Sequence, residues 1–195
     1  VFCSYLNNME TMKTLLSRRS ISKLKTPHPS KDEMADVYQA ALRAPDHSWL
    51  RPWKFIEVTG ESRDKLGKAF INSTKKTEEV DEEREKKIAA LPLRSPMIIV
   101  VVAKINYDKP NVPRLEQIQS TAAAAQNILL ALHDKGYGAY WRTGKYSTER
   151  NEHISSELSL DKNDEVLGYL YVGTPEVDAP KIPELANNDF VTYWN

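Results

Sequence analysis

Three short clusters in this sequence combine residue types that could bind a phosphate group or a flat ring. The first is Ser17-Arg18-Arg19-Ser20, whose two guanidinium groups offer forked N–H donors suited to a phosphate, beside hydroxyls that can bond a polyol. Arginines at the end of a helix can also simply complement the helix dipole. Taken alone, this cluster favours the second, purely structural interpretation.

The second cluster is Arg43-Ala44-Pro45-Asp46-His47, which is followed by Pro52-Trp53. Pro45 ends a helix, and the turn presents Arg43 and His47 together with a carboxylate that could orient the imidazole or set its charge. The alternative is a helix-ending turn with solvated charges. Because loops that carry such groups often form sites, this cluster favours a functional role.

The third cluster is Gly136-Tyr137-Gly138-Ala139-Tyr140-Trp141-Arg142-Thr143-Gly144. Its glycines allow the backbone to approach a ligand closely. Trp141 and Arg142 together offer a flat apolar face next to a cation, which suits a planar cofactor that carries a phosphate. The alternative is a turn from a helix into a strand, with the tryptophan in the core.

Other common chemistry has no support in the sequence. It contains no GxGxxG, P-loop, GxSxG, HExxH or CxxC motif, and its four histidines (His28, His47, His133 and His153) do not have the spacing of metal ligands. Cys3 is the only cysteine, so an intrachain disulfide is excluded. A single thiol suits a reducing compartment, and we expect a cytoplasmic protein.

Composition limits the class of protein. Lys and Arg total 27, as do Asp and Glu, so a net charge of zero gives no overall field that would attract nucleic acid or an anionic membrane. The longest apolar run, from Met97 to Ala103, is too short to span a bilayer. We see no signal peptide, and we expect one domain over residues 1–195, with residues 1–8 disordered or not native to the protein.

Periodicity and turn residues predict alternating helices and strands. Ser30 and Glu33 have the spacing of a capping box, Ser62 is placed to cap a helix, and Gly136 is placed to end one. The charged segment 77–90 reads as a solvated helix with ion pairs, or alternatively as a lid over a ligand site. We expect helices over residues 9–19, 30–43, 62–73, 77–90, 115–135 and 148–158, and strands over 53–59, 96–103, 139–142 and 165–172.

These elements predict an α+β fold with helices on both faces of a sheet. The run from Pro96 to Ala103 is apolar without alternation, which indicates a central strand buried on both faces. The tail ends in Phe190-Val191-Thr192-Tyr193-Trp194. Three aromatic side chains are costly to leave in water, so we expect the tail to pack on another surface, such as a second subunit.

In this order and at this separation, the clusters closely resemble the nitroreductase family, in particular its short branch of NAD(P)H nitroreductases. Each motif is weak alone, but five in register are specific. The resemblance runs from about Met9 to the end of the chain, and its ending, Phe190 to Tyr193, is also similar. The matching stretches are Arg18-Arg19-Ser20, Arg43-Ala44-Pro45-Asp46-His47, Pro52-Trp53, Gly136 to Gly144, and Leu167-Gly168-Tyr169-Leu170-Tyr171-Val172-Gly173-Thr174-Pro175.

This resemblance implies a three-layer α/β/α sandwich with a mixed central sheet, and a homodimer that binds FMN at the subunit interface. Arg18, Arg19 and Ser20 would hold the FMN phosphate and ribityl chain. Arg43 and His47 would reach the flavin across the interface, and Trp141, Arg142 and Thr143 would complete the pocket. The stretch Ala131-Leu132-His133-Asp134-Lys135-Gly136 matches a segment that the branch assigns to the nicotinamide.

The implied reaction passes hydride from NADH or NADPH through the flavin to a nitroaromatic, a quinone or a similar electron-poor acceptor, in a ping-pong scheme that needs no catalytic side chain. Arg142, or a backbone N–H in its turn, would face the charge of the reduced flavin. The alternatives are another reaction on this fold (dehalogenation, flavin destruction or dehydrogenation) and a flavin-binding module that is not an enzyme. Trp49 and the heavy acidic run from Glu78 to Glu85 depart from the branch and leave the substrate open.

Overall fold

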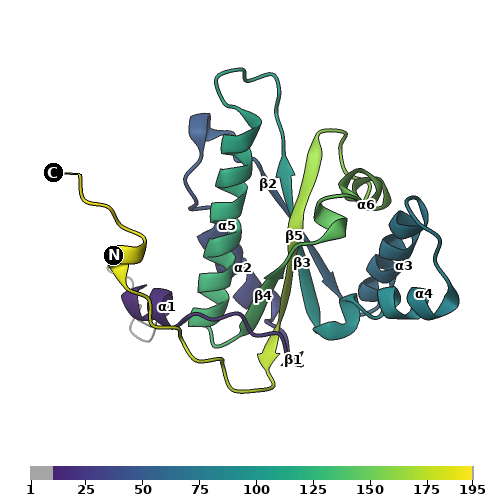
Figure 1. The fold of residues 1–195 in the computed structure, drawn as a ribbon, viewed down its shortest axis with the longest axis horizontal. Coiled ribbons are helices and arrows are strands. Elements are labelled where there is room, and N and C mark those ends of the chain that lie inside the picture. The colour runs from purple at the N-terminus through teal and green to yellow at the C-terminus, as the bar shows by residue number, and fades with distance from the viewer. Residues whose placement is uncertain (1–10, 195) are drawn as a thin grey trace.

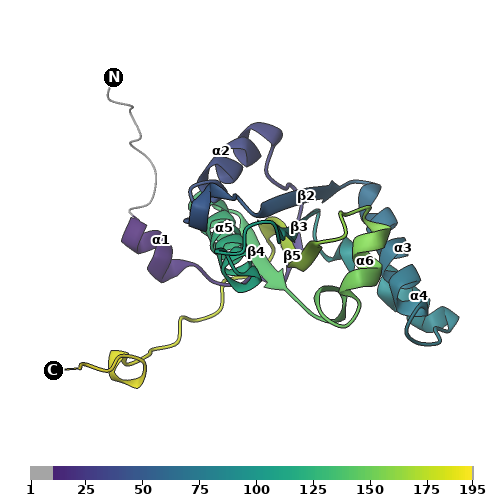
Figure 2. The same cartoon turned by 90° about the horizontal axis from the view of Figure 1, so that it is seen from above.

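The computed structural model describes residues 11–194, which form three layers: helices, a sheet, and helices (Figures 1 and 2). The α+β sandwich that the sequence predicts is therefore confirmed. The expectations for residues 1–8, for Cys3, and for the start of the first helix at Met9 lie outside the described residues. No helix within residues 11–194 is long and apolar enough to cross a membrane.

Within residues 11–194, the sheet has five strands. β3 (Met97–Lys104) lies between β2 (Trp53–Thr59) and β5 (Asp164–Pro175), and β4 (Gly138–Arg142) and β1 (Leu24–Lys25) each pair with β5. All four pairings among the described residues are antiparallel, so the expected mixed sheet is wrong there. Helices that cover both faces of a sheet make its strands apolar on both sides whatever their direction. The apolar pattern therefore predicted burial but could not predict direction.

The centre of β3 is the core of the molecule. Its side chains from Met97 to Ala103 are at most 1% exposed. Ile99 and Val101 point into the apolar cluster on one face of the sheet, whereas Ile98 and Val100 point into the cluster on the other. The alternation of strand side chains thus divides one continuous apolar run between two cores.

Each core is closed by its own helices. α2 (Lys31–Ala41) and α5 (Arg114–Asp134) cover one face, and α1 (Thr11–Ser17) contacts α5 near its end. α3 (Ser62–Lys75), α4 (Glu82–Ala89) and α6 (Asn151–Glu157) cover the other. In Figures 1 and 2 the C-terminal tail runs away from the body of the molecule, on the same side as α1.

The helix starts test the sequence expectations directly. Ser30 and Glu33 form the predicted capping box, with the Glu33 N–H donating to Ser30 Oγ at 3.3 Å. The cap at Ser62 is wrong, because Glu61 holds the capping position and Ser62 is already helical. α4 starts at Glu82 rather than at 77, because Asp81 accepts a hydrogen bond from the Arg84 N–H at 2.8 Å and caps the helix there.

A β-bulge interrupts β5. Val101 pairs with Gly168 and Val102 pairs with Val166, so Leu167 has no partner in β3. Gly168 has a φ of 150°, a conformation that L side chains rarely adopt. The extra residue shifts the alternation by one, so Tyr169 and Tyr171 face the same core as Val166.

Candidate functional site

The chain brings its first and third clusters together along β4. The Ile21 N–H donates to the Ala139 carbonyl at 3.1 Å, so residues just after Arg18 and Arg19 run beside the strand that leads to Trp141 and Arg142. Gly138 permits this approach, since a Cβ at that position would lie 2.8 Å from Leu24 Cδ2. Two motifs more than a hundred positions apart thus form one surface.

The first cluster also meets the end of α5. Ser17 Oγ lies 2.8 Å from His133 Nε2, and Thr14 Oγ1 donates to Asp134 at 3.3 Å. Burial lowers the pKa of His133 from its usual 6.5, and the charges of Arg19 and Arg18 lower it further. The corner where residues 17–20 meet the end of α5 is therefore electropositive.

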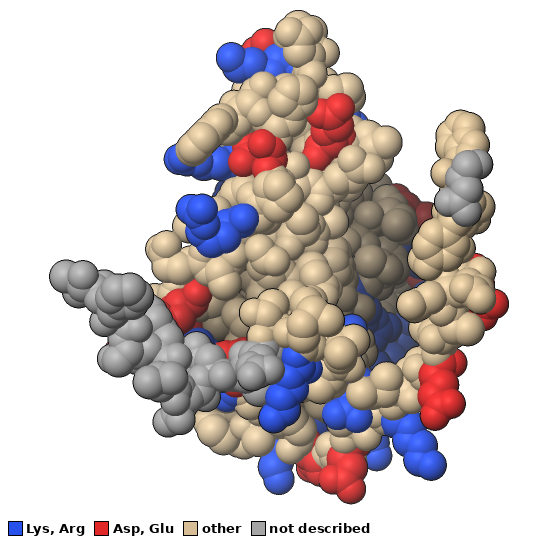
Figure 3. Space-filling model, turned by 90° about the vertical axis from the view of Figure 1, so that its left-hand side faces the viewer, with Lys and Arg blue, Asp and Glu red and all other residues tan. Residues whose placement is uncertain are grey.

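Arg19 has one N–H group without a hydrogen-bond acceptor among the described residues. Its Nη1 donates to the Pro180 carbonyl at 3.0 Å, which ties the tail to this corner, while its buried Nε has no hydrogen-bond partner among the described residues. A buried donor without a partner is costly and therefore marks a place where a ligand acceptor would fit. Figure 3 looks onto this side of the molecule and shows Lys and Arg side chains at the edge of a hollow beside the tail.

The second cluster lies elsewhere. His47 Nδ1 is 2.7 Å from Glu116 Oε2, near the start of α5. At 1.5 Å per residue, the helix separates Glu116 from His133 by about 25 Å. Asp46 does not orient His47, because its carboxylate instead accepts the Arg51 N–H at 2.8 Å. A single chain therefore does not bring His47 to the arginines of the first cluster.

Arg43 occupies an intermediate position. It lines a 640 Å³ groove between α1, α2 and α5, together with Asn127, Ala131 and Asp134. Met12, Leu15 and Leu16 of α1 are 46–66% exposed, so the neighbourhood of this groove presents apolar side chains to solvent. Such a surface is typical of a contact with another protein chain.

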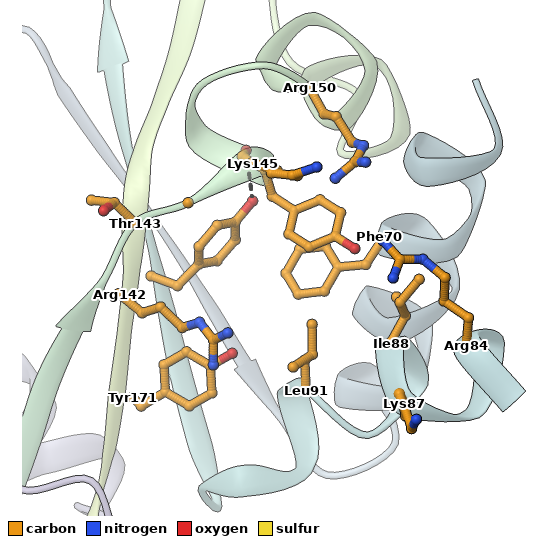
Figure 4. Close-up of a pocket in the computed structure, with 13 residues that line it drawn as sticks. Phe70, Arg84, Lys87, Ile88, Leu91, Arg142, Thr143, Lys145, Arg150 and Tyr171 are labelled. Atoms are coloured by element: carbon orange, nitrogen blue, oxygen red, sulfur yellow. Dashed lines mark hydrogen bonds between the residues drawn. The ribbon is translucent and has the colours of Figure 1, made fainter. Parts of the chain in front are cut away.

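Trp141 and Arg142 do not form one face. As neighbours on a strand they point to opposite sides of the sheet. Trp141 packs on the core beneath α2 and α5, and its buried Nε1 has no partner among the described residues. Arg142 and Thr143 instead line a 270 Å³ cavity on the side of α3 and α4 (Figure 4).

The segment from Ala131 to Gly136 is the last turn of α5 and its end. Leu132 is fully buried in the core, and Lys135 forms an ion pair with Asp36 at 2.8 Å. Gly136 follows the cap residue Lys135 with a φ of 83°, so the predicted role of Gly136 in ending the helix is borne out in substance. Most of these side chains therefore serve the fold, and His133 and Asp134 face the first cluster.

Sequence reasoning missed part of this region. Tyr146, Phe70 and Tyr171 line the cavity beside Arg142, but nothing in the spacing of these residues associates them. The one available signal is Gly168 between apolar residues, which is typical of a bulge and would have shifted the expected faces of β5. Within residues 11–194, no group of three potential metal ligands occurs.

A family model described as the nitroreductase family matches residues 15–174. The chain belongs to the nitroreductase family. The sequence resemblance, and the oxidoreductase class that it predicts, are thereby confirmed. The match covers the first, second and third clusters, as well as the strand that contains the bulge.

Curated relatives agree with this assignment. The Escherichia coli (strain K12) protein named "Putative NAD(P)H nitroreductase YdjA" is 31% identical over 187 residues, which are 95% of this chain and 100% of that protein. A Haemophilus influenzae protein named "Putative NAD(P)H nitroreductase" is also 31% identical, over 186 residues, 95% of this chain and 100% of that protein.

Solved structures share the fold. A nitroreductase-like family protein from Bacillus cereus has a TM-score of 0.80 at 24% identity, with 100% of both chains covered. An FMN-dependent nitroreductase from Clostridium difficile R20291 has a TM-score of 0.69 at 25% identity, covering 95% of this chain and 99% of that one.

Proposed function

We propose that this nitroreductase-family chain is an FMN-dependent oxidoreductase that takes hydride from NADH or NADPH and passes it to an electron-poor small molecule, such as a nitroaromatic or a quinone. The observation that carries the proposal is the bond between Ile21 and Ala139, which places the cationic first cluster beside the turn after β4. The names of the relatives support the nicotinamide donor, and the C. difficile structure supports FMN. We place the enzyme in the cytoplasm, where its donor is kept reduced.

The donors at this site fit FMN. Arg18, Arg19 and Ser20 would hold the phosphate and the ribityl chain, and the unpartnered Nε of Arg19 is the strongest sign of a missing acceptor. The backbone of Trp141, Arg142 and Thr143 would flank the ring. When bound, the flavin supplies the hydride chemistry, so the chain needs no nucleophile or general base.

The electron donor needs an approach to this site. The family resemblance assigns the nicotinamide to residues 131–136, and we retain that assignment as part of the proposal. His133 and Asp134 would make the contacts, because Leu132 is buried. The positive corner around Arg18 and Arg19 also suits the phosphates of a dinucleotide.

A homodimer would complete the site. Within one chain, His47 is separated from His133 by about 25 Å of helix, so His47 can reach a flavin held at Arg18 only from a second copy. Apolar side chains exposed on α1 and on the tail offer the surface for this contact. Trp194 is fully exposed, and Phe190 and Tyr193 are each 72% exposed.

The test is the visible spectrum of the purified protein after loading with FMN and desalting, followed by NADH or NADPH under argon. We expect retained flavin bands that bleach with nicotinamide. Arg18→Ala should lose most of the flavin, whereas Lys68→Ala, which removes an exposed cation on α3, should retain it. A colourless protein after desalting would overturn the proposal, and a flavin that nicotinamide does not bleach would identify a binding module instead.

A further inference from the structure

A polar cavity of 810 Å³ lies at the start of β5, between the first residue of α5 and the helix α6. This volume falls in the range of about 300–1,000 Å³ that is usual for small-molecule sites. Among the described residues that line the cavity, only Leu160 is apolar, and the others carry hydroxyl, amide or charged groups. A ligand of this cavity should therefore be a polar molecule with a short apolar portion.

The cavity is separate from the region assigned to FMN. Asp164 begins β5, whereas Arg142 pairs with Tyr169 five residues further along that strand, which is about 16 Å away at the rise of a strand. β1, which follows the first cluster, pairs with Thr174 and Pro175 at the far end of β5 (Figure 1). None of the residues assigned to FMN lines the cavity. It therefore lies at the opposite end of the sheet from the first cluster.

Asp164 is the residue that points to a ligand. It lines the cavity and is only 6% exposed, and its buried Oδ2 has no hydrogen-bond partner among the described residues. A buried carboxylate oxygen without a donor costs free energy, so such an atom calls for a partner that completes it. The missing partner must donate a hydrogen bond, and a cation is the strongest such donor.

The hydroxyl groups of the lining add acceptors. Ser147 Oγ and Thr148 Oγ1 donate to the Gly144 carbonyl at 3.1 and 3.0 Å, and Ser155 Oγ donates to Asn151 Oδ1 at 3.2 Å. Each hydroxyl has a single hydrogen, so once this hydrogen is used the oxygen can only accept a bond from a ligand. These groups therefore suit a ligand that is rich in N–H donors.

The charges of the lining also favour a cation. Arg114 is neutralised by Glu165, because its Nε donates to Oε1 at 2.5 Å and its Nη2 donates to Oε2. Apart from this pair, one cation, Lys162, lines the cavity together with three carboxylates: Glu152, Asp161 and Asp164. Within residues 11–194, no three acids come together as metal ligands. A molecule with two separated positive charges therefore fits these carboxylates better than a single metal ion does.

We propose that this cavity binds a short aliphatic diamine. One ammonium group bonds to Asp164, the other lies at the exposed carboxylates of Glu152 and Asp161, and the methylene chain contacts Leu160. Each ammonium group has three N–H donors, which match the free oxygens of the lining. A hydrogen bond between two charged groups is about twice as strong as one between neutral groups, so the bond to the buried Asp164 would contribute most of the affinity.

The test is calorimetric titration of the FMN-loaded full chain with 1,4-diaminobutane, 1-aminobutane and 1,4-butanediol. The three probes share a four-carbon chain and carry two, one or no ammonium groups. We expect the diamine to bind about 10-fold more tightly than the monoamine, since one charged hydrogen bond corresponds to about that factor, and the diol not to bind. Asp164→Asn should weaken binding of the diamine by about 10-fold or more, whereas Asp32→Asn, at an exposed acid on α2, should leave it unchanged.

Melting temperatures and a second variant make the result decisive. The diamine should raise the melting temperature of the wild type and of Asp32→Asn but not of Asp164→Asn, and the values without diamine show whether each variant is folded. Glu152→Gln, at an exposed position of α6, should weaken the diamine by about 3-fold and leave the monoamine unchanged, which tests the cavity even if Asp164→Asn does not fold. Equal affinities for diamine and diol, no binding, unchanged binding in both cavity variants, or release of FMN by the diamine would each overturn the inference.

Discussion

The Glu78 carboxylate lies 3.1 Å from Nη2 of Arg150 and 2.5 Å from Nη2 of Arg84. It therefore connects the loop after α3 to α4 and to the start of α6. Arg150 is only 3% exposed, and its Nε also donates to Thr77 Oγ1 at 2.8 Å. Thr77 and Glu78, at the start of segment 77–90, thus hold neighbouring elements together. Of the two interpretations of segment 77–90, this favours a structural one over a lid.

Replacing Glu78 should destabilise the protein in a pH-dependent way. The hydrogen bond from Arg84, with the charges of Arg84 and Arg150, holds the pKa of Glu78 below its usual 4.5. A lowered pKa stabilises the fold above pH 4.5, and this contribution disappears as the pH falls through the folded-state value. Urea unfolding should therefore show Glu78→Gln to be less stable than wild type at neutral pH, with a gap that narrows in acid. Glu79→Gln, at an exposed neighbour, is the control, and equal loss in both variants would contradict the assignment.

Gly168 should not tolerate a side chain. A Cβ there would overlap the Trp141 indole nitrogen and lie 2.9 Å from the Arg142 carbonyl oxygen. Gly168→Ala should lower the unfolding free energy by about 3 kcal/mol or more, because both backbone strain and overlap oppose it. Gly60→Ala shares a positive φ but meets nothing within 4 Å, so it should cost only about 1 kcal/mol. Thermal melts monitored by near-ultraviolet circular dichroism would compare them.

His133 should report the arrival of a phosphate. Its pKa lies below 6.5 because of burial and the charges of Arg19 and Arg18. A bound phosphate would offset these charges, so FMN should raise the pKa of His133, whereas riboflavin, which lacks the phosphate, should not. Titration of the imidazole ring protons by NMR gives the value in each state. Equal shifts in the pKa of His133 with both flavins would show that the phosphate does not bind near this histidine.

The same histidine makes stability depend on pH. A lowered His pKa means that the unfolded chain binds the proton more readily, so stability falls as the pH drops below 6.5 toward the folded-state value. Arg19→Ala removes a repelling charge and should bring the pKa of His133 closer to 6.5. The pH dependence of stability should then flatten near this range, as measured by urea unfolding.

The tail should govern assembly. Its aromatic side chains are exposed in the single chain, so the expectation that they pack on a second subunit stays a prediction. A chain that ends at residue 186 should sediment as a smaller species than the full chain, because it loses the side chains of Phe190, Tyr193 and Trp194. Sedimentation velocity at matched concentrations would compare the two. If truncation leaves the species unchanged, the dimer does not depend on the tail.

Local signals in the sequence located most elements well. The strand predicted at 53–59 has those bounds in the structure, and the capping box at Ser30 is present, since both depend on neighbouring residues alone. The cap at Ser62 failed because Glu61 already holds the capping position. Strand direction depends on long-range packing, so the antiparallel arrangement of the sheet was not predictable from apolar runs.

The site was harder to predict than the fold. Motif order placed Arg18, Ser20 and Arg142 in one family pattern, and the structure brings their segments side by side through Ile21. The pairing of Trp141 with Arg142 as one face ignored strand alternation, which sends them to opposite sides. The aromatic cavity depends on the phase shift at Gly168, and no count of residue types reveals that.

The length of α5 has a genetic consequence. If one end of the helix contributes to a site in its own chain and the other end contributes to the site of the partner chain, each dimer contains two sites, and each site is built from residues of both chains. Arg18→Ala and His47→Ala would then each be inactive alone, yet a mixed dimer would contain one wholly intact site. Refolding the two inactive proteins together at equal amounts should restore roughly a quarter of wild-type activity, because about half the dimers are mixed and each has one working site of two. Complementation between two defective alleles would thus follow from a helix too long for one flavin to span.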